Sequence, residues 1–316
     1  MRVFVTGATG FVGRELVDQL DAAGHSVVGL LLPAEETSLS CTVVRGDITD
    51  PDSLRGLLDG CDAVVHLASA VGYGQRWDTC RALNIDGTEH VAAEAIRAGV
   101  RRFVHMSSVS VYGRRPDVVL HEAVPMVPIG DPYGDTKIAA ERVVRRRAAA
   151  GELDLTIVRP TVIYGPGDRL FLPKIVENLR SGRARIVGSG RNTVDLVHVA
   201  DVAAFLVSAL EDDRAIGRTC NLNNPDNPTW SELLELVADA LHTEPPRGRL
   251  PYPVALGVAG AMEAAAIVTR RPPRLTRYGV RVIGRQYHYP VTAAQELGFA
   301  PSVPLEDGVR RCVEAL

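Results

Sequence analysis

The sequence lacks the cysteine patterns of a disulfide framework or a zinc site. Its five cysteines are scattered over 316 residues, odd in number, and never form a Cys-x-x-Cys pair. Closely spaced cysteine pairs are what structural zinc sites and small secreted domains require. The sequence therefore predicts no metal site, and we expect a reducing compartment, the cytoplasm.

A large charge of one sign and a membrane-length apolar run are also missing. The formal net charge of −3 gives no electrostatic reason to expect a nucleic acid partner. The first residues lead into an expected strand, without the apolar run and cleavage site of a signal peptide. The most apolar stretch, 253–268, is shorter than the ~20 residues of a membrane span and contains Glu263. We expect it to cover an apolar surface, with peripheral membrane contact as an alternative.

What the sequence does contain is an alternation of short apolar runs and longer helical patterns. Continuous apolar strands separated by helices are typical of a parallel sheet covered on both faces. The expected fold class is therefore α/β, a doubly wound parallel Rossmann sheet with a smaller, mostly C-terminal substrate domain. The expected strands lie at 2–7, 25–32, 41–47, 62–69, 101–108 and 153–160.

The alternation breaks down after the segment YGPGD at 164–168, where it gives way to a less regular pattern. We expect 1–165 to form the dinucleotide-binding domain, with 191–219 returning to it. Residues 166–190 and 220–316 would form the substrate domain over the carboxyl edge of the sheet, where ligands of open α/β sheets bind.

The segment TGATGFVG places Gly7, Gly10 and Gly13 between the first expected strand and the first expected helix. Gly7 permits a tight turn, and Gly10 lets backbone N–H groups approach a pyrophosphate. Gly13 allows the helix to pack closely on the strand. Because the triplet opens a βαβ series, it predicts dinucleotide binding.

This glycine spacing, together with Tyr133-x-x-x-Lys137, resembles the extended short-chain dehydrogenase/reductase family, part of the NAD-dependent epimerase/dehydratase superfamily. Further matching segments are GDITD (46–50), HLAS (66–69), NIDGT (84–88) and VRPTVIYGPGD (158–168). The resemblance implies an enzyme in which Asp47 reaches the exocyclic amine of adenine. The cofactor-binding residues that it implies are Gly7, Thr9, Gly10, Phe11, Val12, Gly13, Asp47, Ile48, Leu67, Ala68, Ser69, Asn84, Tyr133, Lys137, Pro160 and Val162.

The end of the second strand usually distinguishes NAD from NADP, because an acid there accepts the ribose 2′-hydroxyl and an arginine pairs with the 2′-phosphate. This chain has neither pattern at Leu31 and Leu32. No lysine or arginine occurs between Glu15 and Val44, and an acid at Glu35 would repel a phosphate. We expect NAD, with NADP not excluded.

Tyr133 lies one helical turn before Lys137, so the two side chains share a face of the expected helix. A free tyrosine has a pKa near 10, too high for a base near neutrality. The Lys137 ammonium and the nicotinamide charge would stabilise a phenolate and lower that pKa. We expect Tyr133 to exchange the proton and Lys137 also to hold the nicotinamide ribose.

By resemblance to the family's SSxxVYG segment, Ser108 would hydrogen-bond the substrate oxygen and stabilise its developing charge. Its neighbours Ser107 and Ser110 would face the core or the cofactor. The resulting reaction is hydride exchange at an alcohol or ketone carbon. We expect the substrate between residues 69–75, the apolar stretch 253–268 and the substrate-binding residues Val71, Ser108, Tyr133 and Tyr164.

The substrate half favours one branch of the family. Nucleotide-sugar epimerases and dehydratases carry an arginine before the VxDVA segment, where this chain has Val194. The segment resembles that of 3β-hydroxysteroid dehydrogenases and β-keto acid reductases, which implies a largely apolar alcohol or ketone. Arg191 keeps the nucleotide-sugar alternative open. A non-catalytic cofactor sensor is a further alternative, although such proteins usually lose the tyrosine or the lysine.

The expected partner is a small-molecule substrate. Dimerisation through a four-helix contact is common in the family that the chain resembles. The helices that would form it here lie at about 77–98 and 134–149, so we expect a homodimer.

Overall fold

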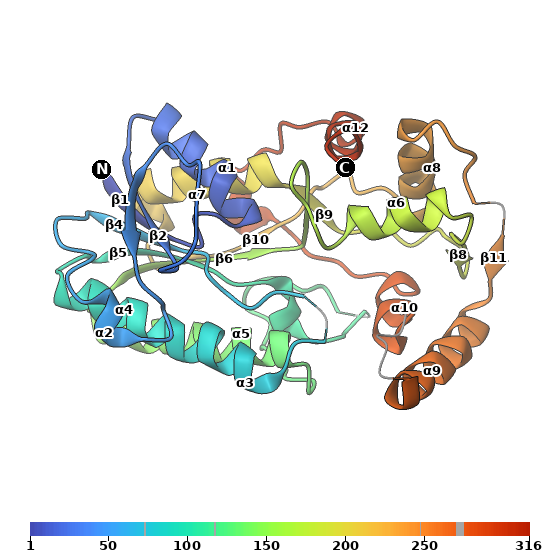
Figure 1. Cartoon of the computed structure of the whole chain (residues 1–316), viewed down its shortest axis with the longest axis horizontal. Coiled ribbons are helices and arrows are strands. Elements are labelled where there is room, and N and C mark those ends of the chain that lie inside the picture. The colour runs from blue at the N-terminus through green and yellow to red at the C-terminus, as the bar shows by residue number, and fades with distance from the viewer. Residues whose placement is uncertain (73, 117, 247, 270–274) are drawn as a thin grey trace.

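The structure, a computed structural model, describes residues 1–72, 74–116, 118–246, 248–269 and 275–316. Its centre is a seven-stranded parallel sheet in the order β10-β6-β5-β4-β1-β2-β3 (Figure 1). This is the predicted doubly wound sheet, in which the strand order reverses at β1. The strands are β1 (Arg2–Thr6), β2 (Ser26–Leu31), β3 (Thr42–Arg45), β4 (Ala63–His66), β5 (Arg102–Met106), β6 (Asp154–Pro160) and β10 (Thr219–Leu222).

The strands are apolar throughout because both faces of the sheet are covered. Successive side chains of a strand point to opposite faces, so Val3 and Val5 join one core cluster and Phe4 joins the other. One face is covered by α1 (Phe11–Ala22) and α7 (Val199–Glu211). The other face is covered by α2 (Pro51–Leu54), α4 (Gly87–Arg97) and α5 (Pro132–Ala149).

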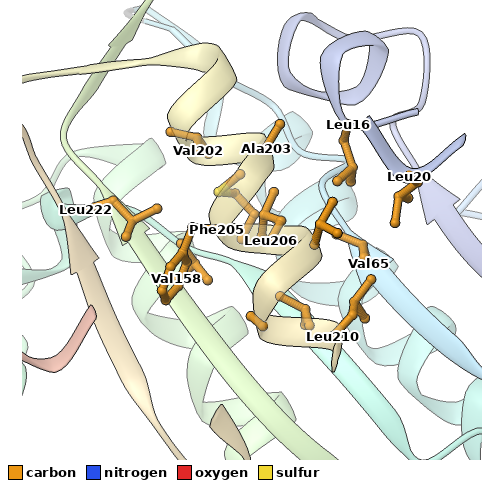
Figure 2. Close-up of a cluster of buried hydrophobic side chains, with 14 of the residues drawn as sticks. Leu16, Leu20, Val65, Val158, Val202, Ala203, Phe205, Leu206, Leu210 and Leu222 are labelled. Carbon is orange, nitrogen blue, oxygen red and sulfur yellow. The ribbon is translucent and has the colours of Figure 1, made fainter. Parts of the chain in front are cut away.

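Helix α7 packs beside α1 on the same face of the sheet (Figure 2). Its residues Phe205, Leu206 and Leu210 are at most 3% exposed, and they pack in one cluster with Leu16 of α1 and Val158 of β6. Helix α7, which returns to the sheet late in the chain, therefore completes the core on the face that α1 also covers.

The long helical pattern at 77–98 is divided into three consecutive pieces. They are α3 (Trp77–Cys80), a π-helical turn η1 (Arg81–Asp86) and α4. A π-turn inside an α-helix is rare and often accompanies a functional site. Here it contains Asn84, whose side chain is buried and hydrogen-bonded.

The C-terminal half is less regular and has its own small cores. Helices α6 (Leu172–Arg180), α8 (Trp230–Ala240) and α12 (Leu305–Glu314) pack together in one cluster, and α9 (Tyr252–Thr269) packs on α10 (Arg277–Ile283) in another. The remaining elements are β7 (Val162–Tyr164), β8 (Ile186–Val187), β9 (Leu196–His198), β11 (Arg249–Leu250), α11 (Thr292–Gln295), η2 (Val109–Tyr112) and η3 (Asp213–Ala215).

Two predicted boundaries differ from the structure. The return to the sheet extends past 219, because β10 runs through Leu222 beside β6, whereas β9 pairs with β7 in a separate two-stranded sheet. In addition, Leu297 and Phe299 pack into the core on the sheet face that α1 and α7 cover. Part of 220–316 therefore belongs structurally to the dinucleotide-binding half, since its apolar side chains cover the edge strand β10.

Candidate active site

The turn after β1 brings three backbone segments close together. Gly7 has φ +69°, and a Cβ there would lie 3.0 Å from the Ala68 nitrogen. A Cβ on Gly13 would lie only 2.0 Å from the Gly7 carbonyl oxygen. Gly7 and Gly13 are thus required because the neighbouring backbone leaves no room for a Cβ. Gly10, at the start of α1, is exposed. This arrangement fits a pyrophosphate at the helix N-terminus.

Helix α5 begins where the sequence predicts the reacting pair. The Asp131 carboxylate caps the helix by accepting the Gly134 N–H at 3.0 Å, and Pro132 occupies the first helical position. The Lys137 Nζ lies 5.9 Å from the centroid of the Tyr133 ring. The structure therefore places the tyrosine and the lysine on one face of α5.

Lys137 is held against the end of β5. Its side chain is 3% exposed, and its Nζ donates to the Met106 carbonyl oxygen at 2.9 Å. Burial lowers the pKa of Lys137 to about 8, against the opposing effect of the Glu141 carboxylate. An ammonium has three donors, so two remain for ribose hydroxyls and the surroundings of Tyr133.

A directed chain of hydrogen bonds begins under the glycine turn. The Thr6 Oγ1 accepts from the N–H groups of Leu67 and Ala68, each at 3.1 Å, so its own proton points to the His66 Nδ1 at 2.8 Å. The His66 Nε2 then donates to Thr88 at 3.0 Å. Burial, assisted by Lys137, lowers the pKa of His66 to about 3 and keeps it neutral.

The chain continues from α4 to the start of α5. The Thr88 hydroxyl donates to the Asn84 carbonyl oxygen at 2.6 Å. The Asn84 side chain accepts the Ala70 N–H at 2.7 Å and donates to Thr136 at 2.9 Å. Thr136 in turn donates to the Pro132 carbonyl oxygen at 2.6 Å. We call Thr6, His66, Asn84, Thr88 and Thr136 the strand-end network, since they join the cofactor turn to the turn that contains Tyr133.

A buried ion pair lies one helical turn beyond Lys137. The Arg159 guanidinium binds both oxygens of Glu141, at 2.8 and 2.7 Å, and neither residue is more than 1% exposed. Burial alone would raise the pKa of Glu141, but Arg159 and a hydrogen bond from Ser107 hold it below its ordinary value. Arg159 also donates to Tyr112 at 2.8 Å. Paired charges of this kind fix α5 against β6.

The serines after β5 face different ways. Ser107 is buried and donates to Glu141 at 2.6 Å, so it faces the core as predicted. Ser108 is half-buried and caps η2 by accepting the Ser110 N–H at 3.2 Å. The Ser110 carbonyl oxygen would lie 3.3 Å from a Cβ on Gly134, so η2 packs on the first turn of α5. Ser108 therefore lies at the same end of α5 as Tyr133.

At the adenosine end, Glu35 folds back onto the glycine turn. Its carboxylate accepts a hydrogen bond from Thr9 and the Leu32 N–H. The Arg45 Nη1 donates to the carbonyl oxygens of Leu32, Pro33 and Glu35. Arg45 lies just outside the segment that the sequence argument considered, and β3 brings it beside the end of β2. Arg45 is therefore a cation near the adenosine end that the sequence did not reveal, whereas Glu35 was identified.

The other predicted cofactor residues line the same region with different exposure. Asp47 accepts from the Thr49 N–H and hydroxyl at 2.8 Å, which fixes its orientation after β3. Ile48 is 5% exposed. Pro160 is buried at the end of β6. The residues that are half-buried at the strand ends and the first turn of α1 are Thr9, Phe11, Val12, Leu67, Ala68, Ser69 and Val162.

Two predicted substrate residues are placed very differently. Val71 is 47% exposed, in a segment at 69–75 of which residue 73 lies outside the described residues. Tyr164 is fully buried in the cluster of α6, α8 and α12. Its ring packs edge to face with the His198 ring, with the two ring centroids 5.2 Å apart. It packs there because Gly308 leaves room for its ring. The structure therefore does not place the Tyr164 hydroxyl among open site residues.

Sequence reasoning overlooked the groups that organise this site. His66 and Asn84 belonged to recognised segments, but no sequence pattern indicated that Thr6, Thr88 and Thr136 connect them. The signal for the Glu141–Arg159 pair was the position of Glu141, one further turn along the face of Lys137.

A parallel sheet with this glycine turn and this tyrosine–lysine pair defines a dinucleotide-binding α/β protein. The model of the NAD dependent epimerase/dehydratase family matches residues 3–223. The chain belongs to this family, and it is an NAD-dependent enzyme of the extended short-chain dehydrogenase/reductase type.

Three curated relatives span nearly the whole chain. The 2-alkyl-3-oxoalkanoate reductase of Stenotrophomonas maltophilia is 30% identical, over 98% of each chain. The UDP-glucose 4-epimerase of Mycolicibacterium smegmatis is 33% identical, over 99% of this chain and 98% of its own. The decarboxylating sterol-4-alpha-carboxylate 3-dehydrogenase of Candida albicans is 28% identical, over 97% and 95%. The predicted hydroxysteroid dehydrogenase-like branch and its epimerase alternative both have relatives here.

Proposed function

We propose that the protein transfers a hydride between NAD and a secondary alcohol or ketone of a largely apolar substrate. The observation that carries this proposal is Val194. It stands where nucleotide-sugar enzymes carry an arginine, and it is 4% exposed inside an apolar cluster. A substrate diphosphate brought there would lack a charge-assisted hydrogen bond, a contact typically worth about 1.5–3 kcal/mol.

The bound NAD supplies the hydride acceptor, and the chain supplies the proton transfer and the positioning. Tyr133 takes the proton from the alcohol, or returns it to the ketone oxygen. Lys137 stabilises the phenolate and donates to the nicotinamide ribose, while Ser108 donates to the substrate oxygen. At the carboxyl ends of the strands, Gly10 would hold the pyrophosphate of the cofactor and Asp47 its adenine.

The relatives narrow the substrate class. The reductase of S. maltophilia is named for a 3-oxo acid with a 2-alkyl chain, and the C. albicans enzyme for a sterol with a carboxylate beside the reacting carbon. Both names describe an apolar molecule with a carboxylate one carbon away from the alcohol or ketone. We infer a β-hydroxy or β-keto acid with a large apolar body as the substrate class.

The second candidate is a nucleotide-sugar epimerase, as the M. smegmatis relative is named. Two arginines near the segment of Val194 support it, because Arg185 and Arg191 are both exposed and cationic. However, Arg185 donates to the carbonyl oxygens of Gly182 and Ala184, which occupies its Nη1. Diphosphate binding would have to release that arginine or depend on Arg191.

One substrate panel separates the two candidates. Purified protein is incubated with NAD and a long-chain 2-alkyl-3-hydroxyalkanoic acid, or with UDP-glucose. We expect substrate-dependent formation of NADH with the hydroxy acid, and no net reduction or sugar interconversion with UDP-glucose. Formation of UDP-galactose without a net change in NADH would contradict the proposal. A Tyr133→Phe preparation serves as the control for contaminating dehydrogenases.

We also propose a cytoplasmic homodimer. All five cysteines are unpaired, four of them buried, which fits a reducing compartment. Asp86 of η1, Glu89 of α4, and Arg146 and Arg147 of α5 line a depression on the helices expected to form the dimer contact, where Glu89 and Arg147 pair with each other. Light scattering should give about twice the 34.0 kDa of one chain, and a mass of one chain would contradict this assembly.

A further inference from the structure

Helix α9 exposes an unbroken apolar face. Val254 and Val258 are 50% and 42% exposed. The residues that follow them at helical spacing are exposed and apolar as well, whereas Ala255 and Ala259 are buried against α10. A contiguous apolar patch exposed on the surface marks an interaction site. We call this surface the α9 face, formed by Val254, Gly257, Val258, Ala261, Ala264 and Ala265.

The surroundings of the α9 face are strongly basic. From Arg249 to Arg285 the sequence has seven arginines and Glu263 as its one acid, a net charge of +6, whereas the rest of the chain carries −9. Glu263 is neutralised by Arg277, whose Nε lies 2.6 Å from its carboxylate. Of the described arginines in this segment, Arg249, Arg277, Arg281 and Arg285 are all exposed.

We propose that the α9 face docks on a membrane surface that contains anionic lipid. An apolar helix face inserts shallowly among headgroups, and adjacent arginines bind their negative charge. Figure 1 shows α9 at an outer end of the molecule, with α10 between it and the sheet. The contact is peripheral: within the described residues, no helix is long and apolar enough to cross a bilayer.

Two other occupants fit the surface less well. A second copy docked through the same face would bring two arginine-rich segments together, and like charges repel. Nucleic acid would use the arginines but leave Val254 and Val258 without a role, since phosphate binding needs no apolar face. A bilayer interface satisfies both features.

The test is vesicle co-sedimentation with the full chain. Phosphatidylcholine vesicles are compared with vesicles that also contain phosphatidylglycerol. Because the exposed side chains are small, charge should decide binding, and we expect at least ~5-fold more protein on the anionic vesicles. High salt should reverse the binding. Equal or negligible binding to both vesicle types would overturn the proposal.

Matched variants locate the contact. The double variant Val254→Asp, Val258→Asp should reduce anionic binding to background, while Ile216→Asp, at an exposed apolar residue directly after η3, should bind like wild type. Arg249→Glu with Arg281→Glu should also lose binding. The matched charge reversals Arg55→Glu and Arg214→Glu, at exposed arginines elsewhere, should not. Wild-type binding by either α9-side variant would contradict the proposal.

A gain-of-signal variant covers the case in which the aspartates disturb folding. Val258→Trp should show a blue-shifted, enhanced tryptophan emission with anionic vesicles and no change with neutral ones. Light scattering without vesicles tests the alternative occupant. Concentration-dependent self-association that Val254→Asp abolishes, without any vesicle binding, would assign the α9 face to a second copy and overturn the membrane proposal.

Discussion

The two sides of this molecule are held together by different forces. On the dinucleotide-binding side, the strand-end network runs through buried side chains from the cofactor turn to the turn of Tyr133. On the other side, α9 and α10 share a small apolar cluster around Ala255, Ala259 and Val280, supplemented by the ion pair of Glu263 and Arg277. Buried hydrogen bonds fix directions, whereas an apolar contact of this size fixes little beyond proximity.

This difference indicates where the chemistry and the specificity reside. The groups that need sub-ångström placement depend on rigid strand ends and a capped helix. We expect the α9–α10 side to tolerate changes in packing that leave Tyr133 in place.

The largest effect is expected at the centre of the constrained side. Tyr133→Phe removes the group that exchanges the proton, a contribution typically worth 10²–10⁴-fold. We expect kcat to fall at least ~100-fold, with NAD affinity nearly unchanged, because the ring and the helix cap remain. Steady-state rates and a cofactor titration on one preparation measure both. Retention of more than a tenth of the activity would assign the proton to another residue.

The strand-end network should affect catalysis more than an apolar contact on the other side does. His66→Phe leaves the Thr6 hydroxyl without its acceptor and Thr88 without its donor. Loss of buried partners costs about 1–3 kcal/mol, and we expect kcat to fall ~10-fold as the turn of Tyr133 shifts. His66→Gln, which keeps one donor and one acceptor, should restore most of the rate.

The matched change on the other side is Val280→Ala, at a fully buried residue of the α9–α10 cluster. It should cost about 1–3 kcal/mol of stability, similar to His66→Phe. We expect it to leave kcat unchanged and to alter only KM. If Val280→Ala lowers kcat as much as His66→Phe does, the α9–α10 cluster also positions the reacting groups, and the distinction between the two sides is wrong.

The sequence predicted the parts of this structure that depend on periodicity and on local rules. The parallel sheet follows from apolar runs, and the glycine turn follows from Gly7 and Gly13. The network was not predictable, because a threonine in β1 and two in helices meet only after folding. Tyr164 shows the converse: a motif residue points into a core when a distant glycine, Gly308, makes space for it.

Lys137 should give the constrained side a characteristic pH dependence. Its pKa is lowered to about 8 in the folded protein, from an ordinary value of 10.5. Between these values the unfolded chain binds more protons than the folded one, so stability rises with pH in that window. Relative to Lys137→Met, the cofactor-free wild type should gain up to about 3 kcal/mol from pH 8 to 10.5. Denaturant unfolding of both proteins across this range measures the difference, and parallel pH curves would contradict the buried ammonium.

The smallest effect concerns the outer end of the cofactor. Glu35 lies against the glycine turn through Thr9, and it would repel a 2′-phosphate while accepting a ribose hydroxyl. Arg45 does not offset this fully, since its Nη1 is held by three carbonyl oxygens. We therefore expect NADH to bind more tightly than NADPH by about 1–2 kcal/mol, the scale of one charge-assisted contact.

Glu35→Gln tests the origin of that preference. It retains the size of the side chain and removes the charge, so the gap between NADH and NADPH should shrink by about 1 kcal/mol, mainly through tighter NADPH binding. Glu36→Gln, at the exposed neighbouring acid, is the matched control and should leave the gap unchanged. Calorimetric titration of both cofactors into the three cofactor-free proteins decides between them. If Glu36→Gln has the same effect as Glu35→Gln, the preference reflects general charge repulsion, and the contact between Glu35 and Thr9 does not select the cofactor.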